Sequence, residues 1–102
     1  MTTGVEHAVQ LSTDTPGTLA VSGVLSFDTA TSAWRSIEAA LTRSPVTTLD
    51  LAGVRHSDSA GLSCVLAVVA EASRRGHALY VANMPAGMRV LSQVCEVDRL
   101  LG

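Results

Sequence analysis

Apolar and polar residues alternate in the first quarter of the chain. Residues 5–11 can place every second apolar side chain on one face, and residues 18–21 do the same after a turn rich in Ser, Thr, Asp, Pro and Gly. Alternation of this kind predicts β-strands, and the turn between them predicts a hairpin at one edge of a sheet. Ser22 and Gly23 are expected to end the second strand.

The spacing of apolar residues becomes helical between Ala30 and Leu41. The apolar residues of this segment recur at spacings of four, three and four, which is one face of an α-helix. Ser26 or Asp28 is expected to cap this helix, and Pro45 follows its end. Trp34 is the largest side chain of the face and is expected to pack against the sheet. The face consists of Ala30, Trp34, Ile37 and Leu41.

The central stretch of the chain predicts a strand, a polar turn and a second helix. Residues 46–51 are mostly apolar or β-branched, as in a strand covered on both faces. Residues 53–58 form the turn, and the helix runs from Ser59 to about residue 75, with Gly76 just after its end. The side chains of Asp58 and Ser59 can accept hydrogen bonds from the free N–H groups of this helix start.

The last third predicts a strand at residues 77–82 and a third helix that begins near Pro85. Residues 98–101 are expected to add one more helical turn. The resulting order is β-β-α-β-α-β-α in a single α/β domain over residues 1–102. We expect a mixed four-stranded sheet whose first hairpin is antiparallel, because each β-α-β step predicts a parallel pair. One face of the third helix carries Met88, Leu91, Ser92 and Cys95.

Composition restricts the class of protein. Of 102 residues, 47% are hydrophobic and 16% are charged, which is typical of a globular domain. The net charge is −2 and no basic stripe is present, so nucleic-acid binding is not expected. Neither a signal peptide nor a run of apolar residues long enough to span a membrane is found. Cys64 and Cys95 are expected to be buried free thiols, with a disulfide between them as the alternative.

The sequence gives little support for catalysis. His56, Asp58 and Ser59 include the residue types of a hydrolase triad, but they are nearly adjacent, and no G-x-S-x-G turn surrounds the serine. The histidines and cysteines lack the close spacings of zinc sites, and no phosphate-binding G-x-x-x-x-G-K-[ST] loop is present. We therefore expect no catalytic residue, no metal site and no cofactor.

Two features of the second helix have alternative interpretations. Ser59 can act only as a helix cap, or it can also present its hydroxyl to a partner, since the same geometry exposes it. The apolar flank at Ala67 and Val68 either lies under the third helix or forms part of a docking surface.

The residues around the turn resemble a known family. Leu49-Asp50-Leu51-Ala52-Gly53-Val54, followed by Ser57-Asp58-Ser59-Ala60-Gly61-Leu62, resembles the signature of STAS domains, in which a strand leads into a D-[ST]-x-G loop and a helix. The resemblance extends over almost the whole chain, including Ala82-Asn83-Met84-Pro85 before the third helix. It implies a non-enzymatic domain that binds another protein.

Two branches of this family are candidates. Anti-sigma factor antagonists carry a serine, at the position of Ser59, that a partner kinase phosphorylates. The MlaB branch docks on the ATPase (MlaF-like) of a phospholipid-transporting ABC complex and reaches the permease only indirectly. Residues 21–28, followed by Trp34, look more like the MlaB branch. Val24 stands where antagonists typically have Glu, and Ala60 stands where many have a second serine.

The MlaB resemblance implies a cytoplasmic protein held at the inner face of the inner membrane through its partner, without inserting into the bilayer itself. The expected contact surface combines the loop before the second helix, the start of that helix and one of its flanks. Its residues are Arg55, His56, Ser57, Asp58, Ser59, Ala60, Gly61, Ser63, Ala67 and Val68.

Overall fold

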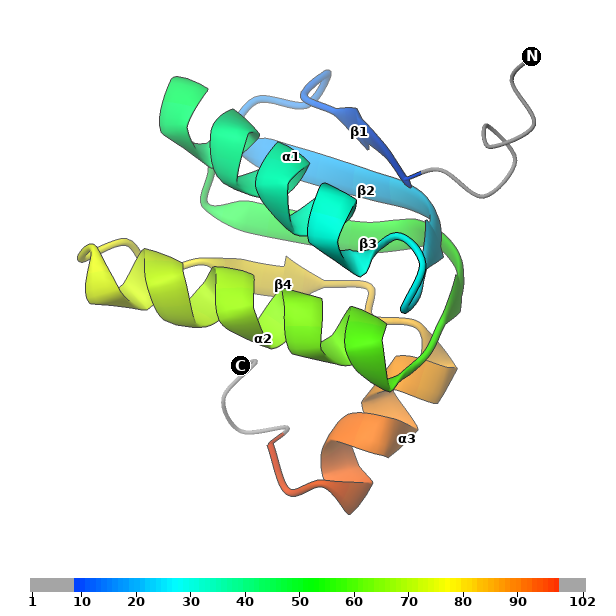
Figure 1. The fold of residues 1–102 in the computed structure, drawn as a ribbon. Helices are drawn as coiled ribbons and strands as arrows, with labels where there is room; N and C mark the ends of the chain where they lie inside the picture. Colours follow the sequence, from blue (N-terminus) through cyan, green and yellow to red (C-terminus); the bar gives the residue numbers. More distant parts are fainter. Residues whose placement is uncertain (1–8, 98–102) are drawn as a thin grey trace, which may run out of the picture.

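Strands and helices follow one another in the computed structural model as the sequence predicts, in the order β-β-α-β-α-β-α (Figure 1). The structure describes residues 9–97. Predictions for residues 5–8 and 98–101 therefore fall outside the described residues. The elements are β1 (Val9–Ser12), β2 (Thr18–Leu25), α1 (Ala30–Arg43), β3 (Thr48–Ser57), α2 (Ser59–Arg74), β4 (Tyr80–Ala82) and α3 (Ala86–Val94).

The four strands form one mixed sheet in the order β1-β2-β3-β4. β1 pairs antiparallel with β2, and Leu11 lies opposite Val21. β3 is parallel to both of its neighbours, so that Leu19, Leu49 and Val81 line up across the sheet. The predicted sheet, with its antiparallel hairpin at one edge, is confirmed.

Two strands are longer than predicted. β2 continues through Ser22 and Gly23 to Leu25, and β3 continues to Ser57 in place of a turn at residues 53–58. The predicted ends were wrong because the polar residues of one strand pair with the other: Gly23 lies opposite Val54, and Leu25 lies opposite Ser57. Interstrand hydrogen bonds therefore outweigh a local composition that favours a turn.

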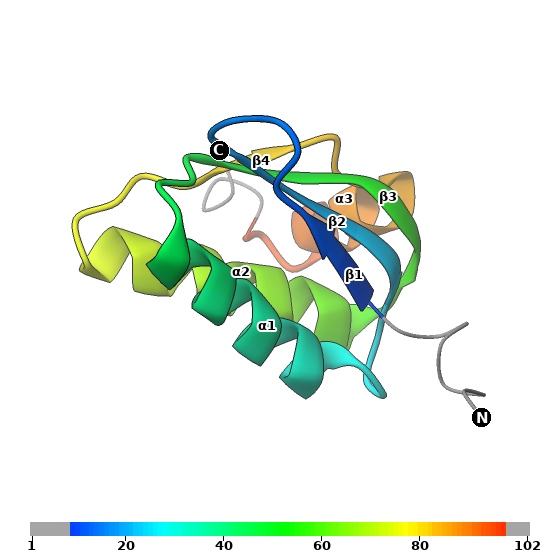
Figure 2. The same cartoon turned by 90° about the horizontal axis from the view of Figure 1, so that it is seen from above.

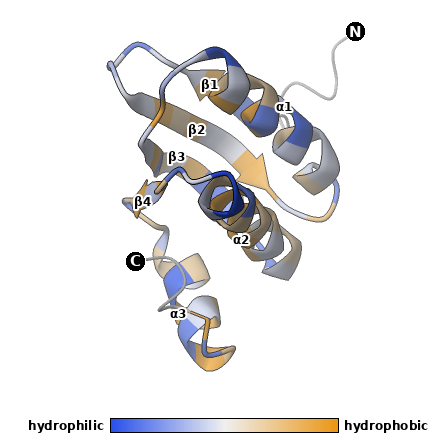
Figure 3. Cartoon of the chain, turned by 90° about the vertical axis from the view of Figure 1, so that its left-hand side faces the viewer, coloured by the Kyte–Doolittle hydropathy of each residue, from blue (hydrophilic) through white to orange (hydrophobic). Residues whose placement is uncertain are grey.

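α1 and α2 lie side by side on one face of the sheet (Figures 1 and 2). Figure 3, in which α2 is seen nearly end-on, shows α1 and α2 together on one side of the strands. The opposite face carries polar residues such as Gln10, Ser22 and Asp50, which share a face by register. The prediction that the central strand is covered on both faces was therefore wrong. The largest fully buried apolar side chains belong to one hydrophobic core: Leu19, Val21, Leu25, Ile37, Leu49, Leu51, Val65, Val68 and Met88.

The buried face of α1 consists of Ala33, Ile37 and Ala40, and Trp34 is 43% exposed. The prediction that Trp34 packs against the sheet was wrong. The helical period predicted for α1 was correct, but the buried face is centred on the two alanines and Ile37, which lie beside the tryptophan. Small residues at these positions allow the helix to approach the sheet closely, and the indole is left at the side of the helix.

The start of α1 is also organised differently from the prediction. Thr29, rather than Ser26 or Asp28, is the N-cap residue. Its hydroxyl accepts a hydrogen bond from the Ser26 N–H (2.9 Å) and donates one to the Val24 carbonyl (2.7 Å). These bonds close the loop between β2 and α1 onto itself and fix the end of β2.

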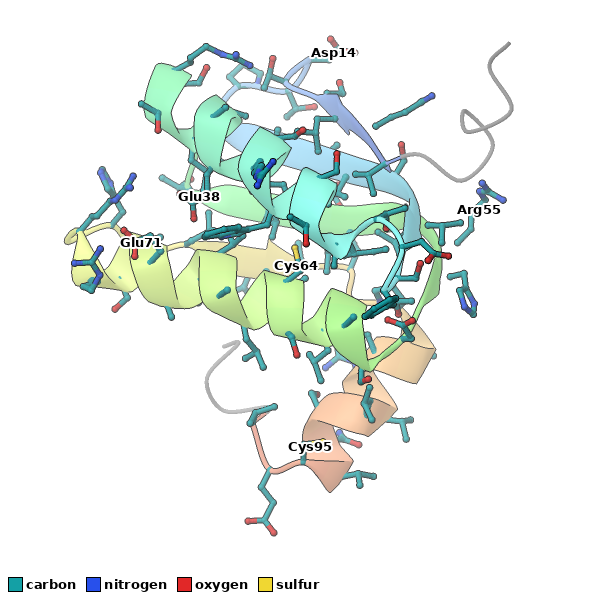
Figure 4. The ribbon with its side chains drawn as sticks, viewed as in Figure 1. Asp14, Glu38, Arg55, Cys64, Glu71 and Cys95 are labelled. Atoms are coloured by element: carbon teal, nitrogen blue, oxygen red, sulfur yellow. The ribbon has the colours of Figure 1, made fainter. Side chains whose placement is uncertain are left out.

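The two thiols differ in their environment. Cys64 is buried in α2 and lies between α1 and α2 (Figure 4), whereas Cys95 is exposed at the end of α3. Both are free, so the disulfide alternative does not apply, and the prediction that Cys95 is buried was wrong. Met88 and Ser92 are the buried positions of α3, in agreement with the predicted face.

Candidate functional site

Asp58 is the residue that caps α2. Its Oδ1 atom accepts hydrogen bonds from the N–H groups of Ala60 (3.0 Å) and Gly61 (3.1 Å), two of the four donors that a helix start leaves unpaired. Ser59 is the first residue of the helix itself and is exposed. The prediction that Ser59 also acts as a cap was wrong, because the carboxylate of the preceding residue already occupies the position that caps the helix. The Ser59 hydroxyl is thus accessible without a structural role in the cap.

The second carboxylate oxygen of Asp58 reaches a different part of the chain. Oδ2 accepts a hydrogen bond from the Phe27 N–H (3.1 Å), and so joins the start of α2 to the loop between β2 and α1. The bond from Phe27 is the main reason that the pKa of Asp58 lies below its usual value, against the opposing effect of desolvation. The Gly61 and Ala60 N–H groups and the nearby His56 side chain lower the pKa of Asp58 further.

Gly61 brings the two segments into close contact. A Cβ atom at this position would lie 2.1 Å from the Leu25 carbonyl oxygen, so only glycine permits the backbones to approach this closely. The start of α2 therefore rests directly on the end of β2, two residues before Phe27 in the chain.

A shallow apolar groove of about 460 Å³ opens beside these contacts, between α1 and α2. Phe27, which is 81% exposed, and Trp34 are its two aromatic residues. No ionisable side chain other than the Cys64 thiol belongs to its lining, and burial raises the pKa of that thiol to about 11, with a further contribution from the negative charge of Glu38. The lining residues are Phe27, Ala30, Thr31, Trp34, Ala60, Ser63, Cys64 and Ala67.

The predicted contact surface is brought together in large part. Arg55 and His56 are exposed near the end of β3, and Figure 4 shows Arg55 directed away from the body of the domain. Along α2, Ser59, Ser63 and Ala67 are exposed. Ser57, Asp58 and Ala60 are half-buried.

Two members of the predicted surface lie inside the domain. Val68 is fully buried in the hydrophobic core, so its predicted contact with a partner was wrong, whereas the neighbouring Ala67 is exposed. Gly61 is buried against Leu25 and contributes to the site through its backbone.

Phe27 and Trp34 are the site residues that the sequence analysis missed. Their positions relative to α2 depend on the packing of two helices about thirty residues apart in the chain, which the sequence alone does not give. A local signal was nevertheless present: Phe27, Ala30 and Trp34 recur at helical spacing directly beside the buried stripe, which indicates a second apolar flank.

The residue types that catalysis or metal binding would use do not converge in the described part of the chain. Within residues 9–97, no hydrogen bond joins His56 to Asp58 or Ser59. No group of three or more His, Cys, Asp or Glu side chains in this range could hold a metal ion. No helix among the described residues is both long and apolar enough to cross a bilayer.

A family model described as "Mlab, STAS domain" matches residues 8–102. The chain belongs to the STAS domain family. No curated protein matches the chain. Its fold is similar to that of the anti-sigma factor antagonist SpoIIAA in its unphosphorylated form, with a TM-score of 0.68, 21% identity, and coverage of 90% of this chain and 84% of that chain.

The Bacillus cell fate determinant SpoIIAA in the phosphorylated form gives a TM-score of 0.65 and 22% identity, with 90% of this chain and 86% of that chain covered. At this level of identity the likeness shows a shared fold. STAS domains are protein-interaction modules, and membership of the family supports a regulatory, non-enzymatic role for this chain.

Proposed function

We propose that this chain is a non-enzymatic accessory subunit that binds and regulates the ATPase of a phospholipid-transporting ABC complex. The match of residues 8–102 to a family model described as MlaB carries this proposal. The partner would hold the chain at the inner face of the membrane, and the permease would be reached only through the ATPase. No cofactor or metal takes part in this function.

The groove between α1 and α2 supplies the docking surface in this proposal. It joins the exposed aromatic side chains of Phe27 and Trp34 to the exposed flank of α2 at Ser63 and Ala67. Aromatic residues are enriched at the centres of protein interfaces, where a few large side chains supply much of the binding energy. Since the lining of the groove carries no Asp, Glu, Lys, Arg or His, the complementary surface of the ATPase is expected to be apolar at this point.

Polar residues near the start of α2 would form the border of the interface in this proposal. Ser59 and His56 are exposed beside the helix start. Polar side chains at the rim of an interface contribute to orientation and association rate more than to affinity. The proposed interface therefore has an apolar centre and a polar border.

A second candidate function is that of an anti-sigma factor antagonist switched by phosphorylation of Ser59 by a partner kinase. The observation that favours it is the exposure of the Ser59 hydroxyl at the first position of α2, where it is not needed as a cap. A phosphate there would add about −1.5 to −2 charges next to the Asp58 carboxylate. The N-terminal dipole of α2 would offset only part of this charge.

Substitution of Ala67 tests the docking surface. Ala67→Arg places a long cation in the groove and is expected to weaken binding to the purified ABC ATPase at least tenfold, about 1.4 kcal/mol. The melting temperature should change little, because Ala67 is exposed. Ala39→Arg is the matched control, since Ala39 is an exposed alanine on α1 that does not line the groove. Equal binding by the two arginine variants would refute this docking surface.

Ser59 variants distinguish the two candidate functions. Ser59→Asn and Ser59→Asp should both fold as the wild type does, because Asp58 supplies the cap. We expect Ser59→Asn to bind nearly normally and Ser59→Asp to bind at least tenfold more weakly, since the added charge lies at the edge of a closed interface. Equal affinity of the Asn and Asp forms would place Ser59 outside the interface. Titration with the ATPase and, separately, with a kinase-type anti-sigma factor identifies the partner.

A further inference from the structure

The loop that carries Phe27 is fixed at two points. On its own side, the Thr29 hydroxyl accepts from the Ser26 N–H and donates to the Val24 carbonyl. On the other side, the Phe27 N–H donates to Asp58 Oδ2, a bond that spans 31 residues of sequence. Of these two restraints, only the second connects the loop to α2.

The two oxygens of Asp58 have separate roles. Oδ1 accepts from the N–H groups of Ala60 and Gly61 and caps α2, whereas Oδ2 accepts from Phe27. A carboxylate can accept at both oxygens, whereas the asparagine side chain has one acceptor and one NH₂ donor. Asparagine caps helices about as well as aspartate, so capping alone does not require the second oxygen.

The ring of Phe27 has few contacts that would hold it in place. It is 81% exposed, yet it lines the groove together with Trp34 and Ala67. The position of such a side chain depends on its backbone. That backbone is fixed relative to α2, which forms the other wall of the groove, by the bond to Asp58.

We propose that Asp58 is a positioning residue for partner docking: it holds Phe27 at the edge of the groove and thereby fixes the two walls of the docking surface relative to each other before the partner binds. This inference rests on the proposed docking function for its consequence in binding. Preorganisation of this kind favours affinity because less ordering remains to be done on association. It also links the start of α2, where Ser59 lies, to the aromatic side of the groove.

The hydrogen bond between the Phe27 N–H and Asp58 can be tested in the free protein by amide hydrogen exchange. The chain contains one phenylalanine, so labelling with ¹⁵N-phenylalanine gives a single amide resonance, that of Phe27. Asp58→Asn replaces the acceptor that faces the Phe27 N–H by a donor and should speed solvent exchange of this amide by about tenfold. In uniformly labelled protein, the amides of Ala60 and Gly61 should keep their protection, because asparagine still caps α2.

Asp50→Asn is the matched control. Asp50 accepts from the Ala52 N–H and from Asn83 through Oδ1 alone, on the sheet face opposite the helices, and the substitution removes the same charge. It should leave Phe27 exchange unchanged. If Phe27 exchanges equally fast in wild type and in Asp58→Asn, Thr29 alone fixes the loop and the proposal is overturned.

A double-mutant cycle tests whether Asp58 affects partner binding through Phe27. Asp58→Asn should weaken binding to the purified ABC ATPase by about tenfold in the wild-type background and by less than about twofold in Phe27→Ala, because its effect then passes through a side chain that is no longer present. Equal weakening in both backgrounds would show that Asp58 contacts the partner itself and would overturn the positioning role. If the exchange result is as expected but Phe27→Ala binds normally, the link in the free protein stands and the proposed docking surface is refuted.

Discussion

Gly61 is the position at which the arrangement of α2 on β2 can be tested most sharply. An alanine Cβ there would lie 2.1 Å from the Leu25 carbonyl oxygen, 3.0 Å from its carbonyl carbon and 3.3 Å from Leu25 Cγ. The nearest atoms belong to backbone at the end of a paired strand, so rotation of a side chain cannot relieve the contact. The start of α2 would have to move away from β2 by roughly 1 Å to restore normal separation.

The expected cost follows from two opposing effects. Overpacking in a closely packed region costs about 1–3 kcal/mol, and alanine is favoured over glycine in a helix by up to about 1 kcal/mol. We therefore expect Gly61→Ala to lower the free energy of unfolding by about 1–2 kcal/mol, measured by urea denaturation. For a domain of this size this corresponds to a decrease in melting temperature of roughly 4–16 °C.

Gly87→Ala is the control for this prediction. Gly87 also lies in the first turn of a helix, α3, and nothing lies within 4 Å of the position where its Cβ would be. This substitution should leave stability unchanged or raise it by up to about 1 kcal/mol. If Gly61→Ala is as stable as Gly87→Ala, α2 does not rest on the end of β2 as closely as the structure indicates.

Three further predictions concern the core, the thiols and acid. In urea denaturation, Trp34→Ala should lower the free energy of unfolding by about 1–2 kcal/mol and Ile37→Ala by about 2–5 kcal/mol, because Trp34 is 43% exposed and Ile37 is fully buried. A larger loss for Trp34→Ala than for Ile37→Ala would contradict this burial of the two side chains. A thiol reagent at pH 8 should modify Cys95 rapidly and Cys64 only on unfolding, since burial raises the pKa of Cys64 to about 11; two fast thiols in the native protein would contradict this. The folded-state pKa values of Asp58 and Asp50 are lowered, chiefly by the Phe27 N–H and the Asn83 amide respectively, so their contribution to stability is present above the unfolded pKa of about 4 and is lost as the pH falls through the folded values. Urea midpoints measured from pH 6 to pH 2 should therefore fall less steeply in Asp50→Asn/Asp58→Asn than in the wild type, and parallel curves would be inconsistent with these two hydrogen bonds.

The element order could be predicted from the sequence because it depends on local periodicity. The alternation before residue 21, the helical stripes and the Gly76 position just after α2, where φ is +84°, are all properties of short segments. The polar signature around Asp58 and Ser59 likewise identified the start of α2 and its exposed hydroxyl. These features depend on neighbouring residues in the chain, so they could be predicted from the sequence.

The features that were missed depend on pairing and packing between distant segments. Ser22 and Gly23 are typical of a turn, but pairing with β3 keeps them in a strand. The burial of Val68, with Ala67 exposed beside it, depends on which way α2 is rotated against the sheet. The groove itself requires Phe27 to lie beside α2, which the bond to Asp58 brings about.

Purification of the tagged chain from its native cell, with quantitative identification of the proteins that accompany it, shows which partner the chain binds. The proposed function predicts that an ABC ATPase accompanies the chain in a fixed stoichiometry, and that Ala67→Arg removes it while Ala39→Arg does not. A kinase-type anti-sigma factor in place of the ATPase, released by Ser59→Asp, would contradict the transporter role and establish the second candidate function.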